Sequence, residues 1–351
     1  MLTRQVDRTV IVIAYLSFVV LGMPTAMLGV VWSPHIRESF ALDLDAVATL
    51  YFTTSCGYFV ASFVSGRLFA RHQIGWLLAG GAALGALAFA GYALAPAWAV
   101  IVALGLAAGF GAGILDGGMN IYFAAHFDAR LMNWLHAAFG IGSTVAPLLI
   151  NLVLGRQGSW RLGYWLVAAL YLVMTTLFVT TRSRWLPLAG AANAGGVRHT
   201  SARATLRLPV VWVGIAIFAL FAGIESSTGQ WAKSIFAEAR GVGEAMASLW
   251  VALYWLSFTV GRILFGFLGQ SISARRLLQV CMVGAVLGMV LLAWNPFTGS
   301  GVVAVSLFGF MFGPIFAMLV TATQERLGGE RAANAIGFQI AAATIGTGLL
   351  P

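Results

Sequence analysis

Charged residues are scarce in this sequence. Only 9% of its 351 residues are Asp, Glu, Lys or Arg, against about 25% in an average soluble domain, and 60% are hydrophobic. The mean hydropathy is +0.91. A composition so poor in charge excludes soluble enzymes, nucleic-acid-binding modules and disordered regulators. It indicates an all-α protein that crosses the lipid bilayer several times.

Cysteine is nearly absent, and so are the motifs of enzymes. The two cysteines, Cys56 and Cys281, lie far apart in apolar runs, which excludes a disulfide framework and a cysteine-based metal site. The sequence contains no Walker loop, no HExxH, no GxSxG and no His/Cys metal spacing. We therefore predict that the protein is not an enzyme and that it has no metal and no cofactor.

The formal charge of +9 does not point to a nucleic-acid partner, because the basic residues lie between apolar runs rather than on one polar face. If the amino terminus is cytoplasmic, the cytoplasmic segments hold fifteen of the 20 Lys and Arg residues and the external segments hold five. Cytoplasmic loops of membrane proteins are enriched in Lys and Arg. The distribution predicts a cytoplasmic amino terminus. We also expect the membrane to be an inner membrane of bacterial type.

Eleven runs are long and apolar enough to cross a bilayer core of about 30 Å as helices of about 20 residues. Strands of a membrane barrel would be about ten residues long with alternating polarity, which these runs are not. The expected spans are 9–32, 47–69, 74–94, 98–125, 131–154, 162–179, 210–236, 245–269, 277–294, 301–323 and 332–351. Pro24, Pro147 and Pro314 are each expected to interrupt a span.

One connection, 181–209, is much longer than the others, rich in Ala and Gly, and contains five arginines and no acidic residue. It separates six spans from five. The division predicts an amino-terminal half (1–180), a cytoplasmic linker (181–209) and a carboxy-terminal half (210–351). The linker's basic residues also suit a lipid headgroup contact, although a topological anchor is the simpler explanation.

The two halves resemble each other. Residues 62–68 match residues 257–263 at an offset of 195, and the glycines at four-residue spacing in 105–117 recur in part at Gly309 and Gly313. Such ladders of small residues let helix backbones approach closely. Residues 140–147 and 345–351 share a glycine followed five residues later by proline. A repeat of six spans predicts a twelfth helix after the last run, so we expect the sequence to be truncated.

Two six-helix halves joined by a cytoplasmic loop describe the major facilitator architecture, and the resemblance extends to particular residues. Residues 66–71 and 261–276 resemble the loop motif that this superfamily carries after its second and eighth helices. The resemblance implies a conformational role for Gly66, Arg67, Arg71, Gly261, Arg262 and Arg275.

Within the superfamily, residues 116–120, 133–136, 223–225 and 229–231 resemble the fucose-galactose-glucose:proton symporter family. This resemblance implies a sugar substrate and a functional acid in the fourth helix. The relatives also use a carboxylate in the first helix, but residues 22–29 contain none. We therefore expect proton coupling to depend on acidic residues elsewhere in this chain.

Only two acids, Asp116 and Glu225, lie deep within a span. An ionisable group in hydrocarbon costs about 2.5–3.5 kcal/mol, so it normally faces a cavity or a partner. Asp116 and Asn120 are four residues apart and share a helix face. We predict that Asp116 and Glu225 couple protons to transport, the alternative for Asp116 being a structural hydrogen bond within the bundle.

The candidate substrate contacts are the amide, imidazole and indole side chains near these acids. Gln230 and Trp231 follow Glu225 and suit a sugar, whose hydroxyls need donors and acceptors and whose C–H face packs on an aromatic ring. An interfacial tryptophan belt is the alternative for this pair. The other candidates are Asn120, Asn133, His136 and Gln339. For each of these, the alternative to a substrate contact is a structural hydrogen bond.

These residues predict a secondary transporter that moves a monosaccharide or similar small polar solute together with protons. The alternative is a proton-driven exporter of an apolar or cationic drug-like compound, which would need an aromatic cavity and fewer hydrogen-bonding residues. The predicted partners are the solute, protons and the lipid bilayer, with no nucleic acid and a monomeric chain.

Overall fold

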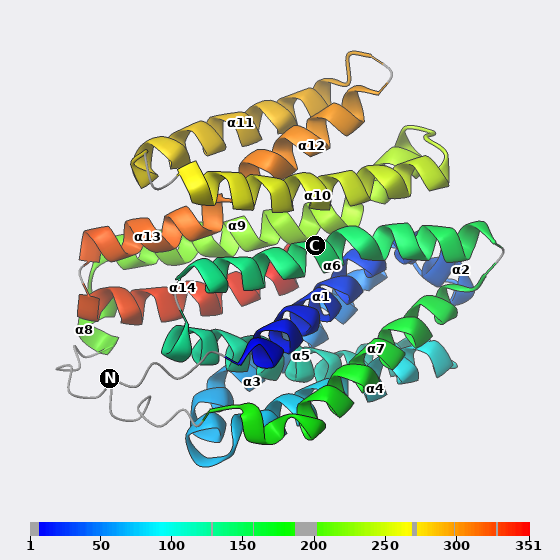
Figure 1. Cartoon of the computed structure of the whole chain (residues 1–351). Coiled ribbons are helices and arrows are strands. Elements are labelled where there is room, and N and C mark those ends of the chain that lie inside the picture. The colour runs from blue at the N-terminus through cyan, green and yellow to red at the C-terminus, as the bar shows by residue number, and fades with distance from the viewer. Residues whose placement is uncertain are drawn as a thin grey trace.

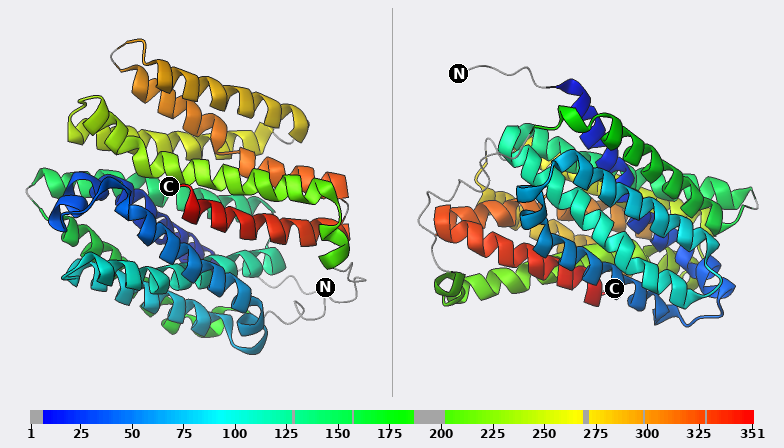
Figure 2. Two further views of the ribbon diagram at one scale, coloured as in Figure 1. Left: turned by 180° about the vertical axis from the view of Figure 1, so that it is seen from behind. Right: turned by 90° about the horizontal axis from the view of Figure 1, so that it is seen from below.

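The computed structural model describes residues 7–127, 129–156, 158–186, 202–268, 272–297, 299–327 and 329–351. Within these ranges the chain is built from helices and short connections, with no strand, which confirms the predicted all-α class. The helices form two bundles, one above the other in Figure 1, and Figure 2 shows the same two bundles from behind and from below.

The amino-terminal helices form the blue-to-green bundle of Figure 1. They are α1 (Arg8–Val31), α2 (Arg37–Ser39), α3 (Val47–Arg71), α4 (Ile74–Leu94), α5 (Trp98–His126), α6 (Ala129–Gly155) and α7 (Trp160–Thr180). A kinked segment, η1 (Trp32–Ile36), in which the backbone of Ser33 is extended, joins α1 to α2, and short 3₁₀ turns lie at η2 (Leu44–Ala46) and η3 (Arg182–Arg184).

The carboxy-terminal helices form the yellow-green to red bundle. They are α8 (Ala202–Leu206), α9 (Pro209–Ser234), α10 (Glu244–Leu268), α11 (Ala274–Trp294), α12 (Ser300–Phe312), α13 (Ile315–Leu327) and α14 (Gly329–Leu349), with a π-helical turn η5 (Ile235–Ala239) after α9. The division of the chain at 181–209 stays a prediction, because most of that segment lies outside the described residues.

The surface of the bundles is apolar, as expected for helices that face lipid. In the described part of the chain, nine helical segments are long and apolar enough to cross a membrane, against the eleven spans expected from the sequence; α3 and α14 are not among the nine. Large aliphatic side chains point outward; Leu87, for example, is 70% exposed. Two of the long helices begin at a polar cap: the Asp7 carboxylate accepts a hydrogen bond from the Thr9 amide at 2.9 Å, and the Ser159 hydroxyl accepts one from the Arg161 amide at 3.2 Å.

The internal repeat reappears in the helix contacts. In the amino-terminal bundle α1 packs on α6 and α3 on α5, and in the carboxy-terminal bundle α9 packs on α14 and α10 on α12. Gly142 lies so close to the Val19 carbonyl that a Cβ atom would overlap it, and Gly346 lies in the same way against Ala219. The glycines matched by sequence thus support the same close crossing in each bundle.

Replacing Gly142 by alanine is expected to destabilise the fold. The added methyl has no free space, so α1 and α6 must separate, and overpacking of this kind costs about 1–3 kcal/mol. Gly80 is the matched control, because nothing lies within 4 Å of its Cβ position. We expect Gly142→Ala to lower the melting temperature of the purified protein by several degrees and Gly80→Ala to leave it unchanged or slightly higher. Equal effects of the two substitutions would contradict the packing argument.

The two bundles meet along three helix pairs, α6 with α10, α3 with α14 and α1 with α9. Small residues lie at these crossings. Gly29 on α1 contacts the backbone of α9 at Gly229, and Gly140 on α6 contacts Thr259 on α10. Because the residues at these crossings are small, the two bundles approach closely. Polar side chains from different bundles, such as Tyr51 and Gln230, therefore lie within hydrogen-bonding distance.

Two of the three prolines do not interrupt their helices, contrary to expectation. Pro24 lies inside the continuous helix α1 and Pro147 inside α6. Neighbouring helices and local adjustments of the backbone let proline stay within a membrane helix. Pro314 does break its span, since α12 ends at Phe312 and α13 begins at Ile315.

Candidate functional site

A continuous chain of polar side chains crosses the amino-terminal bundle. The Tyr58 hydroxyl on α3 donates to Oδ2 of Asp116 on α5. Nδ2 of Asn120 donates to the other carboxylate oxygen of Asp116 at 3.1 Å. Oδ1 of Asn120 lies 3.1 Å from Nε2 of His136 on α6. Asp116, Asn120 and His136 were predicted from the sequence as candidate site residues. Tyr58 was not predicted.

The glycine ladder of α5 accounts for the position of Tyr58. A Cβ atom at Gly113 would lie 2.9 Å from the Tyr58 carbonyl oxygen, and one at Gly109 would overlap the Thr54 carbonyl. The backbone of α5 therefore lies directly against α3. This contact brings the Tyr58 hydroxyl to Asp116, which follows Gly113 by about one helical turn.

The polar chain ends at the boundary between the bundles. The His136 ring packs edge-on against Phe18, with ring centroids 5.7 Å apart. From the opposite bundle, the guanidinium of Arg262 on α10 interacts electrostatically with His136. The polar chain thus faces Arg262 of the opposite bundle at this point.

Arg262 also faces the second deep acid. It interacts electrostatically with Glu225 on α9, although in the described part of the chain the two form no ion pair within 4 Å. Its Nε donates to the Gly313 carbonyl at 3.1 Å, at the break between α12 and α13, and its guanidinium lies 4.6 Å from the Phe258 ring centroid. The Tyr254 hydroxyl donates to the main-chain carbonyl of Glu225 at 3.4 Å. Arg262 therefore lies within the helix bundle beside Glu225, whereas the sequence assigned it to a loop motif.

Gln230 lies at the crossing of α1, α3 and α9. Its side chain is 1% exposed, and its Oε1 accepts a hydrogen bond from the Tyr51 hydroxyl on α3 at 2.8 Å. Among the described residues, its buried Nε2 has no acceptor. The same holds for Nε1 of Trp255, whose indole packs on Gly229. Trp231 differs, because its Nε1 donates to the Pro351 carbonyl at 2.9 Å.

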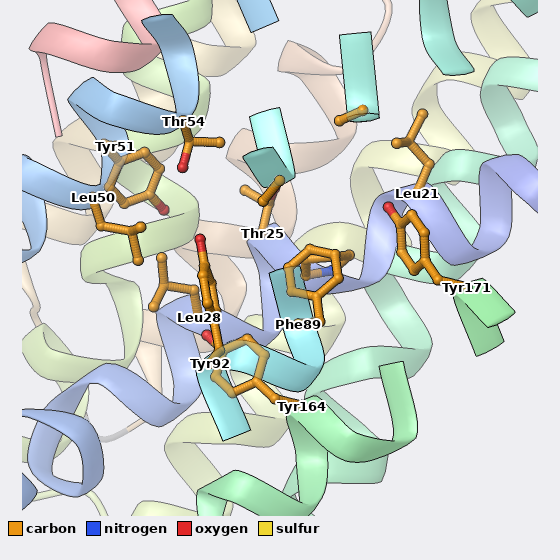
Figure 3. A pocket seen from close by; sticks show the side chains of 13 residues that line it. Leu21, Thr25, Leu28, Leu50, Tyr51, Thr54, Phe89, Tyr92, Tyr164 and Tyr171 are labelled. Carbon is orange, nitrogen blue, oxygen red and sulfur yellow. The ribbon is translucent and has the colours of Figure 1, made fainter. Parts of the chain in front are cut away.

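A cavity of about 90 Å³ lies in the amino-terminal bundle, between α1, α3, α4, α5 and α7. Figure 3 shows the hydroxyls of Tyr51, Thr54 and Tyr92 converging in it. Aromatic rings supply much of the remaining wall, namely those of Phe89, Tyr164 and Tyr171. Tyr51 joins this cavity to the opposite bundle, since its ring lines the wall and its hydroxyl bonds to Gln230.

The remaining predicted residues lie apart from these groups or cannot be compared with them. Gln339 is 2% exposed and accepts a hydrogen bond from Thr323 at 3.2 Å, an inter-helix contact. Gly261 packs against the Phe310 carbonyl, and Arg275 is exposed near the start of α11. The other four fall outside the described side chains, namely Asn133, Gly66, Arg67 and Arg71.

Comparison with known proteins places this architecture in a family. The profile described as Major Facilitator Superfamily matches residues 14–351. This chain belongs to the Major Facilitator Superfamily. The family and its apolar helices make it an integral membrane protein that crosses the bilayer several times.

Relatives and solved structures agree with this family. The chain is 25% identical to "Bypass of stop codon protein 6" of Saccharomyces cerevisiae over 74% of its length, and 24% identical to the "Glucose/mannose transporter GlcP" of Bacillus subtilis over 68%. It spans 57% and 61% of the length of these two relatives. The fold matches a mutant form of the nucleoside transporter NupG with a TM-score of 0.79 and 16% identity, over 98% of this chain and 88% of that one.

Proposed function

We propose that this facilitator is a secondary active transporter that moves a small polar solute, a monosaccharide in the first instance, by alternating access with proton coupling. The observation that carries the proposal is the polar chain from Tyr58 through Asp116 and Asn120 to His136, built inside an apolar bundle. Such groups are costly in a membrane and mark ion or substrate pathways. The glucose/mannose transporter among the relatives supports the choice of solute.

Asp116 and Glu225 are the proposed proton carriers, one in each bundle. Both oxygens of Asp116 accept hydrogen bonds when the group is a carboxylate. A hydroxyl can donate or accept, so Tyr58 can turn to accept once Asp116 holds a proton. Glu225 interacts electrostatically with Arg262, so the charge left there after a proton departs would be compensated.

Gln230 and Trp255 are the proposed solute donors. Buried polar groups in folded proteins are nearly always hydrogen-bonded, so two buried N–H groups without acceptors need an explanation. The hydroxyls of a sugar would supply the acceptors when the site is occupied. The indole ring would at the same time offer a face for the sugar's C–H groups.

The primary test adds hexoses and deoxyhexoses, one at a time, to energy-depleted cells that express the protein in light buffer, while external pH is recorded. Proton symport predicts alkalinisation by one or a few sugars and none by the rest. Cells carrying empty vector give the background. Absence of any pH change, in cells where the protein is present in the membrane, would refute proton-coupled sugar uptake.

Replacing Trp255 by phenylalanine is expected to weaken solute binding while leaving the fold intact. The substitution removes the unpaired N–H and keeps an aromatic ring. One hydrogen bond contributes about 0.5–1.5 kcal/mol, so we expect the KM for the transported sugar to rise about 3- to 10-fold. Trp294→Phe is the matched control, since Trp294 is 74% exposed. An unchanged KM in Trp255→Phe would show that the Trp255 N–H does not bind the solute.

Export of an apolar or cationic compound is the second candidate, and the aromatic cavity of Figure 3 favours it. The cavity wall is mainly rings and aliphatic groups, which suit an apolar ligand. Loading cells with fluorescent cationic dyes and following their efflux distinguishes the two functions. Efflux that requires the proton gradient, with no sugar-dependent pH change, would favour export.

We also propose that the amino terminus is cytoplasmic and that the membrane is an inner membrane of bacterial type. The support for the orientation is the ratio of fifteen to five in basic residues between the segments that the sequence assigns to the cytoplasmic and the external side. Reporter fusions at the amino terminus and after Trp294 test this orientation, because the two points lie on opposite sides of the membrane. Activity at the amino terminus of a reporter that works only on the external side would show the opposite orientation.

A further inference from the structure

Helix α1 is broken at the end where it meets α9, and the break leaves two backbone carbonyls without helical partners. The regular partner of the Val30 carbonyl would be the amide of residue 34, which is a proline and has no N–H. The regular partner of Ser33 would be the Arg37 amide, which donates to Pro34 and Trp32 instead. Ser33 itself is extended, with φ −116° and ψ 133°.

Lys233, at the end of α9 in the opposite bundle, supplies the missing donors. Its Nζ donates to the Val30 carbonyl at 2.8 Å and to the Ser33 carbonyl at 3.0 Å. Oε2 of Glu244, at the start of α10, lies 3.5 Å from the same nitrogen. The Lys233 side chain is 1% exposed, and it is the only charged side chain that is fully buried in the described part of the chain.

The other charged side chains near Lys233 are more exposed, so their ion pairs contribute less to holding the two bundles together. Glu244 is 53% exposed and also lies 3.3 Å from Nε2 of His35. Arg37 and Glu238 form a second pair between the bundles at 3.1 Å, with side chains 27% and 39% exposed. Exposed pairs are weakened by water and salt. The buried ammonium on two carbonyls is therefore the strongest polar link between the bundles at this end.

We propose that Lys233 is a tethered cation that keeps this end of the transporter closed. When its ammonium occupies the carbonyls of the α1 break, α1 and α9 are held together. The ammonium has to leave them each time the two bundles separate at this end. Broken membrane helices use freed carbonyls to hold cations in other transporter architectures. Here the cation is a side chain of the other half. This role does not depend on which solute the protein carries.

The test measures access to a single cysteine at Leu28, a buried residue of the cavity wall on α1. Cys56 and Cys281 are first replaced by serine and alanine in the full-length chain. A membrane-impermeant maleimide is then applied, in vesicles of known orientation, to the side where α1 and α9 end. We expect Lys233→Met to raise the labelling rate at least tenfold, because it removes the ammonium and its N–H donors while keeping an unbranched side chain only one atom shorter.

Two variants separate closure from general packing. Lys233→Arg, which keeps the charge, is expected to restore most of the slow labelling. Arg37→Met, which removes the exposed pair, should change the rate less than twofold. An unchanged rate in a folded Lys233→Met protein, or an equal rise in Arg37→Met, would overturn the proposal.

Chemical rescue provides a second measurement, which also applies if Lys233→Met does not fold. Lys233→Ala leaves the two carbonyls and a space that a small ammonium ion can enter. Propylammonium, which has N–H donors, should slow the labelling and raise the melting temperature of this variant. Tetramethylammonium, which has the charge but no N–H, should do neither. Equal effects of the two ions, or none from either, would show that the carbonyls are not a cation site.

Discussion

Asp116→Asn is expected to abolish concentrative uptake while leaving solute exchange intact. A proton that crosses 100 mV releases about 2.3 kcal/mol, which sustains roughly a 50-fold solute gradient for one coupled proton. Asparagine cannot take up or release that proton. Cells carrying the variant should therefore equilibrate the sugar without accumulating it, and addition of sugar should no longer alkalinise the medium.

The substitution keeps most of the local hydrogen bonding, so loss of coupling can be separated from loss of fold. Asparagine still offers one carbonyl oxygen to Tyr58 or Asn120, and the Tyr58 hydroxyl can turn to accept from the new amide. We expect normal membrane levels and a counterflow rate within about threefold of wild type. A threefold change corresponds to a free energy smaller than that of a typical hydrogen bond. The matched control is Asp43→Asn, an exposed acid between α2 and α3. Full accumulation by Asp116→Asn would exclude this residue as the proton carrier.

The fold could be predicted from the sequence because its causes are local. Each span is a continuous apolar run, and the second half repeats the glycine positions of the first, as in the pair Gly142 and Gly346. Three members of the polar chain were also predictable, since charge and amide groups are rare in apolar helices. Asp116, Asn120 and His136 stand out for that reason.

Other residues depend on which helices face each other, and the sequence does not specify this directly. Tyr58 is one tyrosine among eight until α5 is known to lie against α3. Arg262 looked like part of a loop motif because it follows Gly261 near the end of a span, but its side chain turns back to Gly313. In the sequence, Lys233 is one of the five basic residues of the segments expected to be external. Its role follows from the break in α1, and Pro34 was the signal that could have indicated it.

Arg262→Gln is expected to destabilise the protein and slow transport, and Glu225→Gln should correct part of the loss. Removing the guanidinium leaves Glu225 without its nearby cation and the Gly313 carbonyl without its donor. A directly bonded buried pair costs about 3–5 kcal/mol when one partner is removed. The two charges here are not in contact, so we expect about 1–3 kcal/mol, seen as a fall of a few degrees in melting temperature.

The double substitution distinguishes charge coupling from simple loss of packing. If Arg262 acts on Glu225, the Arg262→Gln, Glu225→Gln protein should be more stable than the sum of the two single losses predicts, because neither charge is left alone. Strictly additive losses would mean that Arg262 acts through Gly313 and Phe258 instead. Arg326→Gln, on an exposed residue at the end of α13 and outside the loop motif, should change neither stability nor transport. Proton-coupled uptake should stay absent in the double variant if Glu225 carries a proton, since stability would return without a titratable group.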